Sequence, residues 1–319
     1  MIDWLLVLTL LSVAAVLACL RFIGCAQILG IKDWQDPPPP PDYGKLINND
    51  FTMVAYWRLG EPANTLPGAT AADERNAHNG TYQNVVLMAG AQSAAAAGVL
   101  IPGQPGLVAT APTQTSVNVD GGYVKVDFNP DLALNPAADK SFSVEAWAVP
   151  EWSAMETDVF RSVVASREDT GTSRHGYILY AGPVLDPATY VTTDATMHWQ
   201  AWVGDGAKNN WVMLVGPPVA VGQTTYLLLT YDGGTQTLTL DAVTNPVPET
   251  SPPPRLSMPA VYSPNPGKPL YIGMGATEIM VPPGQPMYPF RGRLQDIAFY
   301  GAVLTTDQVS KHLKEAVGP

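Results

Sequence analysis

Hydrophobic and polar residues alternate with a period of two along much of the chain beyond residue 50. Such alternation places every second side chain on one face of a β-strand, and Gly, Pro, Asn and Asp between the segments are typical turn residues. The segments with this pattern are 116–128, 142–149, 175–182, 197–204, 210–216, 224–233 and 237–243. The pattern predicts an antiparallel β-sandwich in which one face of each strand is turned to the core.

One segment near the C-terminus follows the period of an α-helix instead. In residues 305–316, TTDQVSKHLKEA, the apolar Val309 and Leu313 are four positions apart and would share one helical face. Thr306 is the expected N-cap. The chain is therefore predicted to be mainly β, with a short C-terminal helix.

The first 34 residues show no alternation and carry almost no charge. Residues 4–20 contain no charged side chain, and after Arg21 the apolar run continues to residue 31. At 1.5 Å per residue, the first part of the run would span ~26 Å as a helix, near the thickness of a bilayer core. Trp4 and Trp34 flank the run as interfacial aromatic residues do. We predict a transmembrane helix in 1–34, with Arg21 reaching the interface or a partner subunit.

A processed N-terminus is the alternative. Signal peptides begin with a basic region, whereas this chain begins with MID. The sequences VLAC and FIGC each resemble a bacterial lipoprotein cleavage box, so lipidation at Cys19 or Cys25 stays open. We favour the retained anchor.

Five consecutive prolines, 37–41, follow the apolar run. They predict a polyproline II rod of about 3.1 Å per residue, which would hold a domain at a fixed height above a membrane. The chain is accordingly divided into an anchor (1–34), a Pro-rich rigid linker (35–50) and a globular domain (51–319).

Composition and charge narrow the possible functions. Charged residues make up 14% of the chain, and 28 Gly with 31 Pro favour turn-rich β-structure. The formal net charge of −11 argues against nucleic-acid binding. Both cysteines lie in the N-terminal run, so the globular part has no disulfide and no thiolate metal site.

The order of several motifs resembles the laminin-G-like, concanavalin-A-like jelly-roll family of bacterial surface proteins. The motifs are MVAYWRLGE (53–61), ADERNAHNGTY (72–82), FSVEAWAVP (142–150), YLLLTYDG (226–233), LYIGMGA (270–276) and FRGRLQDIAFYGAVLTTDQVSKHL (290–313). The resemblance covers about residues 51–316 and implies an antiparallel jelly-roll sandwich. It indicates little about function, because this fold occurs in lectins, enzymes, adhesins and scaffolds.

The sequence lacks the arrangement of acidic residues that glycoside hydrolysis requires in this general fold. Glycosidases of this general fold place acidic residues two and four positions apart along one strand, so that they share a cleft. Here Glu145 is isolated in its strand, Glu151 follows Pro150, and the four His are dispersed along the chain. No GxSxG or HExxH motif occurs. We therefore expect that the protein is not an enzyme.

The resemblance also implies a candidate calcium site, because many domains of this family bind one Ca²⁺ through loop carboxylates and carbonyls. The candidate ligands are Asp73, Glu74 and Asn76 after the first strand and Asp296 in the closing motif. Gln295 stands where the family usually has an acid, which removes a charge. Solvated turn residues are the alternative that we favour.

Tryptophans are the candidates for a ligand or interface site. Trp57 and Trp147 lie in alternating segments and are expected in the core. Trp199 and Trp202 have opposite parity in one strand, so one of them should leave the core side, and Trp211 follows closely. An exposed Trp can stack on a sugar or anchor a protein interface.

Three functions of different classes follow. The one we favour is a non-catalytic structural subunit in the bacterial inner membrane, with its jelly-roll on the periplasmic side of a larger complex, such as an energy-transducing one. Its partners would be other subunits and the lipid bilayer, and Trp4, Arg21 and Trp34 would make the membrane contacts. The alternative is a membrane-tethered carbohydrate-binding module. An enzyme is the third.

Overall fold

The computed structural model describes residues 42–84, 100–110, 114–120, 122–130, 133–153, 160–207, 211–247, 255–275 and 288–318. The predicted anchor and the five prolines lie outside these ranges, as do Trp4, Arg21 and Trp34. Within the described ranges, no helix combines the length and the apolar character needed to cross a membrane. The chain divides into the units Met1–Pro40 and Pro41–Pro319, and the described residues all belong to the second.

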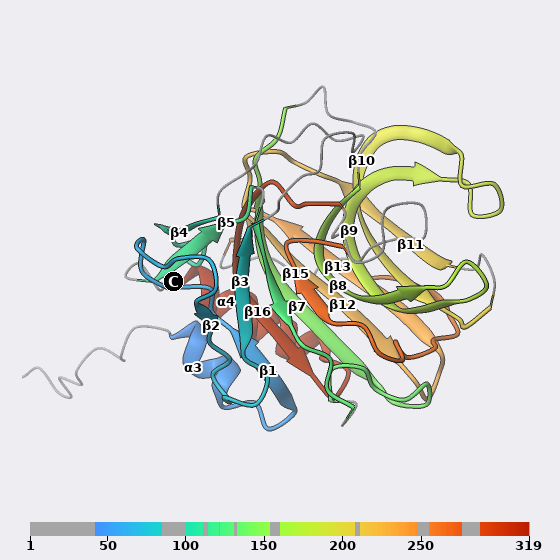
Figure 1. The fold of residues 1–319 in the computed structure, drawn as a ribbon, viewed down its shortest axis with the longest axis horizontal. Coiled ribbons are helices and arrows are strands. Elements are labelled where there is room, and N and C mark those ends of the chain that lie inside the picture. Colours follow the sequence, from blue (N-terminus) through green and yellow to red (C-terminus); the bar gives the residue numbers. More distant parts are fainter. Residues whose placement is uncertain are drawn as a thin grey trace, which may run out of the picture. The chain divides into compact units, whose positions relative to one another are not determined.

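The described residues form two helices and sixteen strands (Figure 1). The helices are α3 (Tyr43–Asn48) and α4 (Thr306–Val317). The strands are β1 (Met53–Trp57), β2 (Thr70–Ala71), β3 (Gly80–Asn84), β4 (Ile101–Pro105), β5 (Thr115–Asn118), β6 (Gly122–Val126), β7 (Phe142–Pro150), β8 (Arg161–Asp169), β9 (Arg174–Leu185), β10 (Thr192–Gly204), β11 (Trp211–Pro218), β12 (Thr225–Asp232), β13 (Thr237–Thr244), β14 (Leu256–Pro259), β15 (Leu270–Ile272) and β16 (Gly292–Tyr300).

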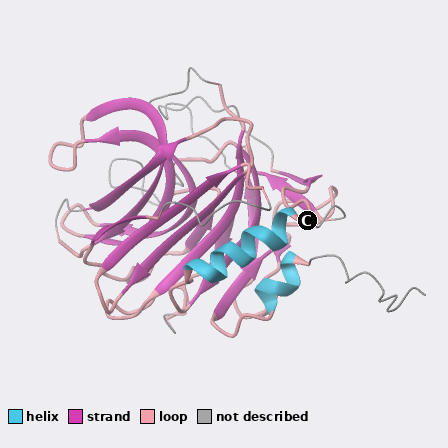
Figure 2. Ribbon diagram, turned by 180° about the vertical axis from the view of Figure 1, so that it is seen from behind, coloured by secondary structure: helices cyan, strands magenta, loops and turns pink. Residues whose placement is uncertain are grey.

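These strands form two antiparallel sheets of eight strands each. The first has the order β14-β13-β12-β7-β16-β5-β4, with β1 also paired to β16. We call it the helix-covered sheet, because α3 and α4 lie along its outer face (Figure 2). The second has the order β11-β10-β9-β8-β15-β6-β3-β2. We call it the curved sheet, because β9 and β10 bend strongly (Figure 1). The predicted antiparallel β-sandwich with a short C-terminal helix is confirmed.

The main core lies between the two sheets and is rich in aromatic side chains. Trp57 and Trp199 are fully or almost fully buried in it. The Phe142 ring lies 5.0 Å from the Tyr177 ring and 5.7 Å from the Phe299 ring, measured between centroids. Aromatic pairs at such separations stabilise a core beyond the area that they bury. The prediction that Trp57 belongs to the core is therefore confirmed.

A second core lies between the helix-covered sheet and its two helices. Tyr226 and Leu228 of β12 point into it, whereas Leu227 and Leu229 point into the main core. Because both faces of β12 are covered, its apolar and polar residues do not alternate, and its sequence reads as a continuous apolar run. Trp147 is buried as predicted, but in this second core rather than between the sheets.

Helix α4 begins one residue earlier than its predicted cap implies. Thr305 is the N-cap, and its side chain accepts the Gln308 backbone N–H while the Gln308 side chain accepts the Thr305 N–H. This reciprocal pair is a capping box. Thr306 is the first helical residue, so its prediction as the cap was wrong. The buried face of α4 includes Val309 and Leu313, as predicted.

Helix α3 belongs to the folded domain and not to a linker. Asp42 caps it by accepting the Lys45 backbone N–H at 3.0 Å. Tyr43 and Ile47, four positions apart, are 1% and 0% exposed in the second core. The compact unit therefore begins before the predicted boundary at residue 51, because one helical turn with two apolar residues is enough to extend the core.

Candidate functional site on the curved sheet

The outer face of the curved sheet carries an aromatic cluster, which four neighbouring strands build. Ala165 of β8 lies opposite Ile178 of β9, and Ile178 lies opposite Trp202 of β10. Trp202 in turn lies opposite Met213 of β11. Side chains that face one another across adjacent strands are in contact. The register thus aligns one continuous row of side chains across the sheet.

The alternation of β10 separates the three tryptophans singled out in the sequence. Trp199 is buried between the sheets, whereas Trp202 lies on the outer face of the curved sheet. Trp211 of β11 joins Trp202 there, with 6.2 Å between the ring centroids. The expectation that Trp199 and Trp202 face opposite sides is confirmed, and only Trp202 and Trp211 can belong to one surface site.

Further aromatic side chains complete the cluster, and sequence analysis did not single them out. The Tyr180 ring lies 5.3 Å from the Trp202 ring in an edge-on arrangement, and the Phe160 ring lies at the same distance. Tyr288 lies 5.9 Å from the rings of Tyr180 and Phe160. Phe160 and Tyr288 lie outside the strands, so no strand alternation could have placed them on this face.

A buried arginine lies among these rings. Arg167 of β8 is 1% exposed, and its guanidinium lies 5.5 Å from the Trp211 ring centroid and 5.7 Å from that of Tyr288. Its Nη1 donates to the Tyr180 hydroxyl at 2.8 Å. Such contacts stabilise a cation by interaction with the ring faces. The opposite residue in β9 is Gly176, whose backbone φ of +89° is one that few other residues adopt.

An amide fixes the orientation of the Trp202 indole. Gln200, 1% exposed, accepts the Trp202 Nε1–H at 2.8 Å through its Oε1. Its Nε2 donates to the carbonyl oxygens of Gly182 and Pro183 at 2.8 and 2.9 Å. The indole N–H is therefore satisfied within the protein, and Trp202 presents carbon rather than a free donor to its surroundings.

Exposure divides the cluster into an inner part and a rim. Trp202 and Trp211 are each 4% exposed, whereas Tyr190, Met213 and Tyr288 are partly exposed. The turn between β9 and β10 positions Tyr190, whose hydroxyl accepts the Trp211 backbone N–H at 3.4 Å. The rim is therefore the part of the cluster that reaches the surface, and the inner rings lie beneath it.

The turn that carries Tyr190 is built around a carboxylate. Asp186 accepts the backbone N–H groups of Ala188 and Thr189 at 2.9 and 2.8 Å. The hydrogen bonds from Thr189, and then that from Ala188, lower the pKa of Asp186 below its ordinary value. The ionised carboxylate therefore stabilises the turn at neutral pH.

A second aromatic pair extends the same face toward β6. Tyr271 of β15 lies opposite Ala165 on one side and Lys125 of β6 on the other. The Tyr123 and Tyr271 rings lie 5.7 Å apart, and Lys125 pairs with Asp127 at 2.7 Å. Burial raises the pKa of Tyr271, so its hydroxyl stays protonated and can donate a hydrogen bond. At about 4.8 Å between strands, the row from β6 to β11 spans roughly 24 Å.

The candidate calcium ligands have other partners in the structure. The Asp73 carboxylate is 1% exposed and accepts four backbone N–H groups at 2.8 to 3.2 Å. Glu74 pairs with Arg58 at 2.7 Å, and Asn76 is exposed with a φ of 56°. Within the described ranges, no three His, Cys, Asp or Glu side chains are grouped as metal ligands. The calcium ion stays a prediction.

Asp296 is buried in a polar contact of its own. Its carboxylate is 0% exposed, accepts the Tyr56 hydroxyl, and accepts Gln295 Nε2 at 2.9 Å. Burial raises the pKa of Asp296 to about 7. Gln295, which replaces an acid in the expected pattern, therefore acts as a donor to Asp296.

A shallow open hollow of about 480 Å³ lies elsewhere, along the edge of the helix-covered sheet. Its lining is mostly small or apolar, with no charged side chain: Gly103, Gln104, Pro105, Gly106, Val108, Ala109, Gln114 and Thr115. Ligand sites combine apolar walls with a few converging polar groups. The aromatic cluster of the curved sheet matches that description better than this hollow.

Residues 120–310 match the laminin-G-type family model described as the concanavalin A-like lectin/glucanases superfamily. The match covers more than half of the chain, and the chain belongs to this family. No curated protein matches the sequence.

Some solved structures resemble this chain at low sequence identity. The binding domain of botulinum neurotoxin serotype C1 has 9% identity and a TM-score of 0.49 over 85% of this chain and 53% of that one. Domain 4 of AbnA, an extracellular arabinanase from Geobacillus stearothermophilus solved with arabinotriose, has 15% identity and a TM-score of 0.45 over 82% of this chain and 98% of that one. This chain spans about half the length of the botulinum neurotoxin domains that it matches.

Proposed function

We propose that the domain is a non-catalytic carbohydrate-binding module and that its ligand lies on the outer face of the curved sheet. The observation that carries this proposal is the row of side chains from Lys125 to Met213, in which Tyr271 and Trp202 provide ring surfaces. Sugars offer C–H faces that stack on aromatic rings and hydroxyls that bond to nearby polar groups. Membership of a superfamily that includes lectins is consistent with this function.

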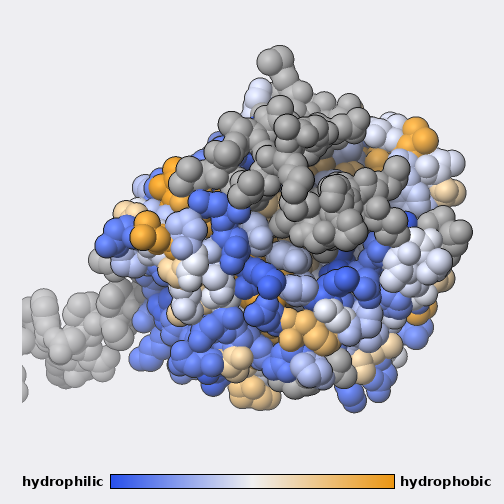
Figure 3. Space-filling view, viewed as in Figure 1, coloured by the Kyte–Doolittle hydropathy of each residue, from blue (hydrophilic) through white to orange (hydrophobic). Residues whose placement is uncertain are grey.

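The character of the surrounding surface supports a ligand rich in hydroxyl groups. On the side seen in Figure 3, described residues are mostly hydrophilic, with hydrophobic ones scattered among them. Extensive protein interfaces instead centre on contiguous apolar patches. A partly exposed aromatic rim within a polar surface suits an oligosaccharide better than a large protein partner.

The chemistry of the cluster supports binding without catalysis. Glycoside hydrolysis requires a pair of carboxyl groups on opposite sides of the scissile bond. Among the described residues, the side chains of the cluster are aromatic, aliphatic, amide or guanidinium, and none is a carboxylate. Asp169 of β8 is paired with Arg174, and the Asp194 carboxylate of β10 lies 3.6 Å from His198 Nε2.

A glycan array with the full chain, followed by calorimetry on a hit, tests this proposal. Tyr190→Ala and Tyr271→Ala should each weaken binding about fivefold, since an aromatic contact contributes on the order of 1 kcal/mol. Phe51→Ala is the matched control, because Phe51 is an aromatic residue that is 94% exposed and lies outside the curved sheet. If the array gives no hit, or if the tyrosine variants bind as tightly as the control, the proposal is wrong.

A second candidate function is the membrane-anchored structural subunit that sequence analysis favoured. The observation in its favour is Arg21 within an apolar run. A charged residue at the centre of a membrane helix costs roughly 2.5–3.5 kcal/mol unless it finds a partner or reaches the interface. In this proposal a neighbouring subunit supplies the partner, in the bacterial inner membrane, with the domain on the periplasmic side.

Solubilisation in mild detergent and sizing chromatography separate the two functions. For a structural subunit, Arg21→Leu should release the chain from a larger complex while the melting temperature of the domain stays the same. For a carbohydrate-binding module, sugar affinity should survive deletion of residues 1–41. If the chain elutes alone and Arg21→Leu changes nothing, the structural-subunit proposal is refuted.

A further inference from the structure

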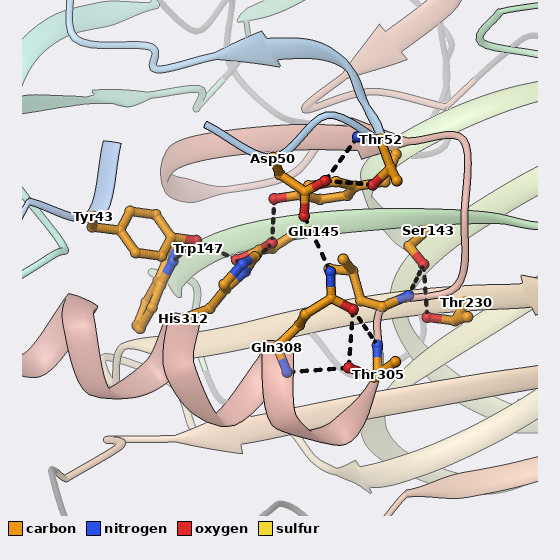
Figure 4. A network of polar contacts seen from close by, with 12 residues as sticks. Tyr43, Asp50, Thr52, Ser143, Glu145, Trp147, Thr230, Thr305, Gln308 and His312 are labelled. Atoms are coloured by element: carbon orange, nitrogen blue, oxygen red, sulfur yellow. Dashed lines mark hydrogen bonds and ion pairs between the residues drawn. The ribbon is translucent and has the colours of Figure 1, made fainter. Parts of the chain in front are cut away.

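A buried acid–base pair lies on the outer face of the helix-covered sheet (Figure 4). Glu145 of β7 is 0% exposed, and His312 of α4 is 2% exposed. His312 Nδ1 and Glu145 Oε2 are 2.9 Å apart, although the residues are separated by 167 positions in the sequence. A charge buried this deeply is stable only when it has a close partner. The buried Glu145 carboxylate is therefore stabilised by a cationic partner only while His312 keeps its proton.

The Glu145 carboxylate also holds helix α3. The Tyr43 hydroxyl of α3 donates to Glu145 Oε1, and the Tyr300 hydroxyl of β16 donates to Oε2 at 2.8 Å. Trp147 Nε1 donates to the Tyr43 hydroxyl at 2.9 Å. Figure 4 shows Tyr43, Trp147 and His312 gathered around Glu145. One carboxylate thus connects α3, β7, β16 and α4.

His312 is the cationic side chain in contact with Glu145 among the described residues. Burial by itself lowers the pKa of His312, but the charge of Glu145 and its hydrogen bond outweigh burial and raise the pKa above 6.5. Other charged groups of the packed elements lie around the pair rather than on it. They are Asp50 before β1, Arg58 after β1, Asp241 of β13 with Arg255 before β14, Asp296 of β16, and Lys311 of α4, together with the tyrosines Tyr56 and Tyr226.

Helix α3 is the smaller of the two covers over this pair. It has six residues, of which Tyr43, Gly44 and Ile47 are buried, whereas α4 has twelve. If His312 loses its proton, no cation among the described residues remains in contact with the Glu145 carboxylate, and water is the remaining source of solvation. Lifting α3 admits water with less loss of buried apolar area than lifting α4.

We infer that α3 is a pH-controlled latch, which is closed on the sheet while His312 is protonated and opens when His312 loses its proton. Opening lengthens the segment that precedes β1. Six residues span about 9 Å as a helix and up to about 20 Å when extended. The latch therefore changes the reach of the chain that connects the domain to residues before 42.

The direction of the pH effect follows from the raised pKa of His312. A histidine with a higher pKa in the folded state adds stability that is fully present below the unfolded value, near 6.5. That stability is lost as the pH rises through the folded value. Each unit by which folding raises the pKa makes the latch about tenfold harder to open at low pH than at high pH.

Hydrogen–deuterium exchange of the full chain in mild detergent tests the latch. Peptides covering 43–53 report on α3, and a peptide covering 177–181 of β9 is the internal reference. After correction for the intrinsic exchange rate, the opening constant of α3 relative to β9 should rise severalfold from pH 6 to pH 9, because the pKa of His312 is raised in the closed state. If both peptides change by the same factor, the latch is refuted.

Two variants make the test specific to the pair. His312→Gln keeps an N–H donor without a titrating proton, so α3 should exchange equally at both pH values. Tyr43→Phe removes only the hydroxyl and should lower the protection of α3 at pH 6, while β9 is unchanged. If His312→Gln keeps the parent's pH dependence, or if Tyr43→Phe leaves α3 fully protected, the inference is overturned.

Discussion

The substitution Asp73→Asn removes half of the acceptors that organise the loop after β1. Asp73 Oδ1 accepts the backbone N–H groups of Tyr56 and Arg75 at 2.8 and 3.2 Å. Its Oδ2 accepts those of Ala77 and His78 at 3.1 and 3.0 Å. An asparagine offers one oxygen, and its NH₂ group would face two of the four donors. At least two hydrogen bonds are lost in a site that is 1% exposed.

The expected loss follows from these lost bonds. A hydrogen bond to a charged acceptor contributes about 1.5–3 kcal/mol, so two lost bonds lower the free energy of unfolding by roughly 3 kcal/mol or more. Water cannot replace the acceptor at a buried carboxylate. Domains are stable by about 5–15 kcal/mol, so the loss is a substantial fraction. With a urea m-value of about 3 kcal/mol/M, the unfolding midpoint should fall by about 1 M.

Urea unfolding of a fragment that begins at residue 41, followed by circular dichroism, measures the effect. Asp186→Asn is the matched control, because Asp186 also accepts backbone N–H groups in a turn but is exposed. Its midpoint should change far less, since water replaces the lost acceptor. Each midpoint is measured in Ca²⁺ and in EGTA. Equal shifts for both variants would refute the reasoning, as would a Ca²⁺-dependent gain in the parent that Asp73→Asn abolishes.

Three further changes should alter stability in defined directions. Gly176→Ala should cost about 3 kcal/mol in urea unfolding or prevent folding, because its φ is +89° and a Cβ would lie 1.9 Å from a backbone oxygen; a normal midpoint would contradict this. Burial raises the pKa of Asp241 to about 6 and that of Asp296 to about 7. Both groups bind a proton more tightly when folded, so they stabilise the domain at acidic pH and lose that effect as the pH rises through 6 and 7. The melting temperature should therefore be higher at pH 5 than at pH 8, and Asp241→Asn should reduce this difference. Leu313→Ala, in a residue 2% exposed, should cost about 3 kcal/mol, whereas Leu66→Ala, in a residue 71% exposed, should melt like the parent.

The aromatic cluster could be predicted only in part. Parity along β10 requires Trp199 and Trp202 to face opposite sides, and the sequence alone was enough for that conclusion. The alternation of side chains along β10 does not show which of its two faces is turned to the main core, because both faces of this strand are largely buried. The sequence also contained no sign that Phe160 and Tyr288 join the cluster, since they are far apart along the chain and outside the strands.

The pair of Glu145 and His312 was beyond reach of the sequence. Glu145 was interpreted as an isolated acid, because no acidic neighbour shares its face within β7. Its partner comes from α4, and the distance between them depends on how that helix lies across the sheet. The nine residues of β7 are all buried. The charged residue Glu145 within this buried strand was therefore the one local sign of a polar contact beneath the helices.

The sequence by itself determined the class of fold: period-two alternation, turn residues and a single amphipathic segment specify an antiparallel sandwich with a C-terminal helix. These are local properties, because strand alternation and helix capping depend on residues within a few positions of one another. The tertiary structure alone decided which faces are covered, which side chains form the aromatic row, and that α3 extends the domain before residue 51. Those features depend on strand register and on packing between segments more than a hundred residues apart, and no local pattern encodes such distances.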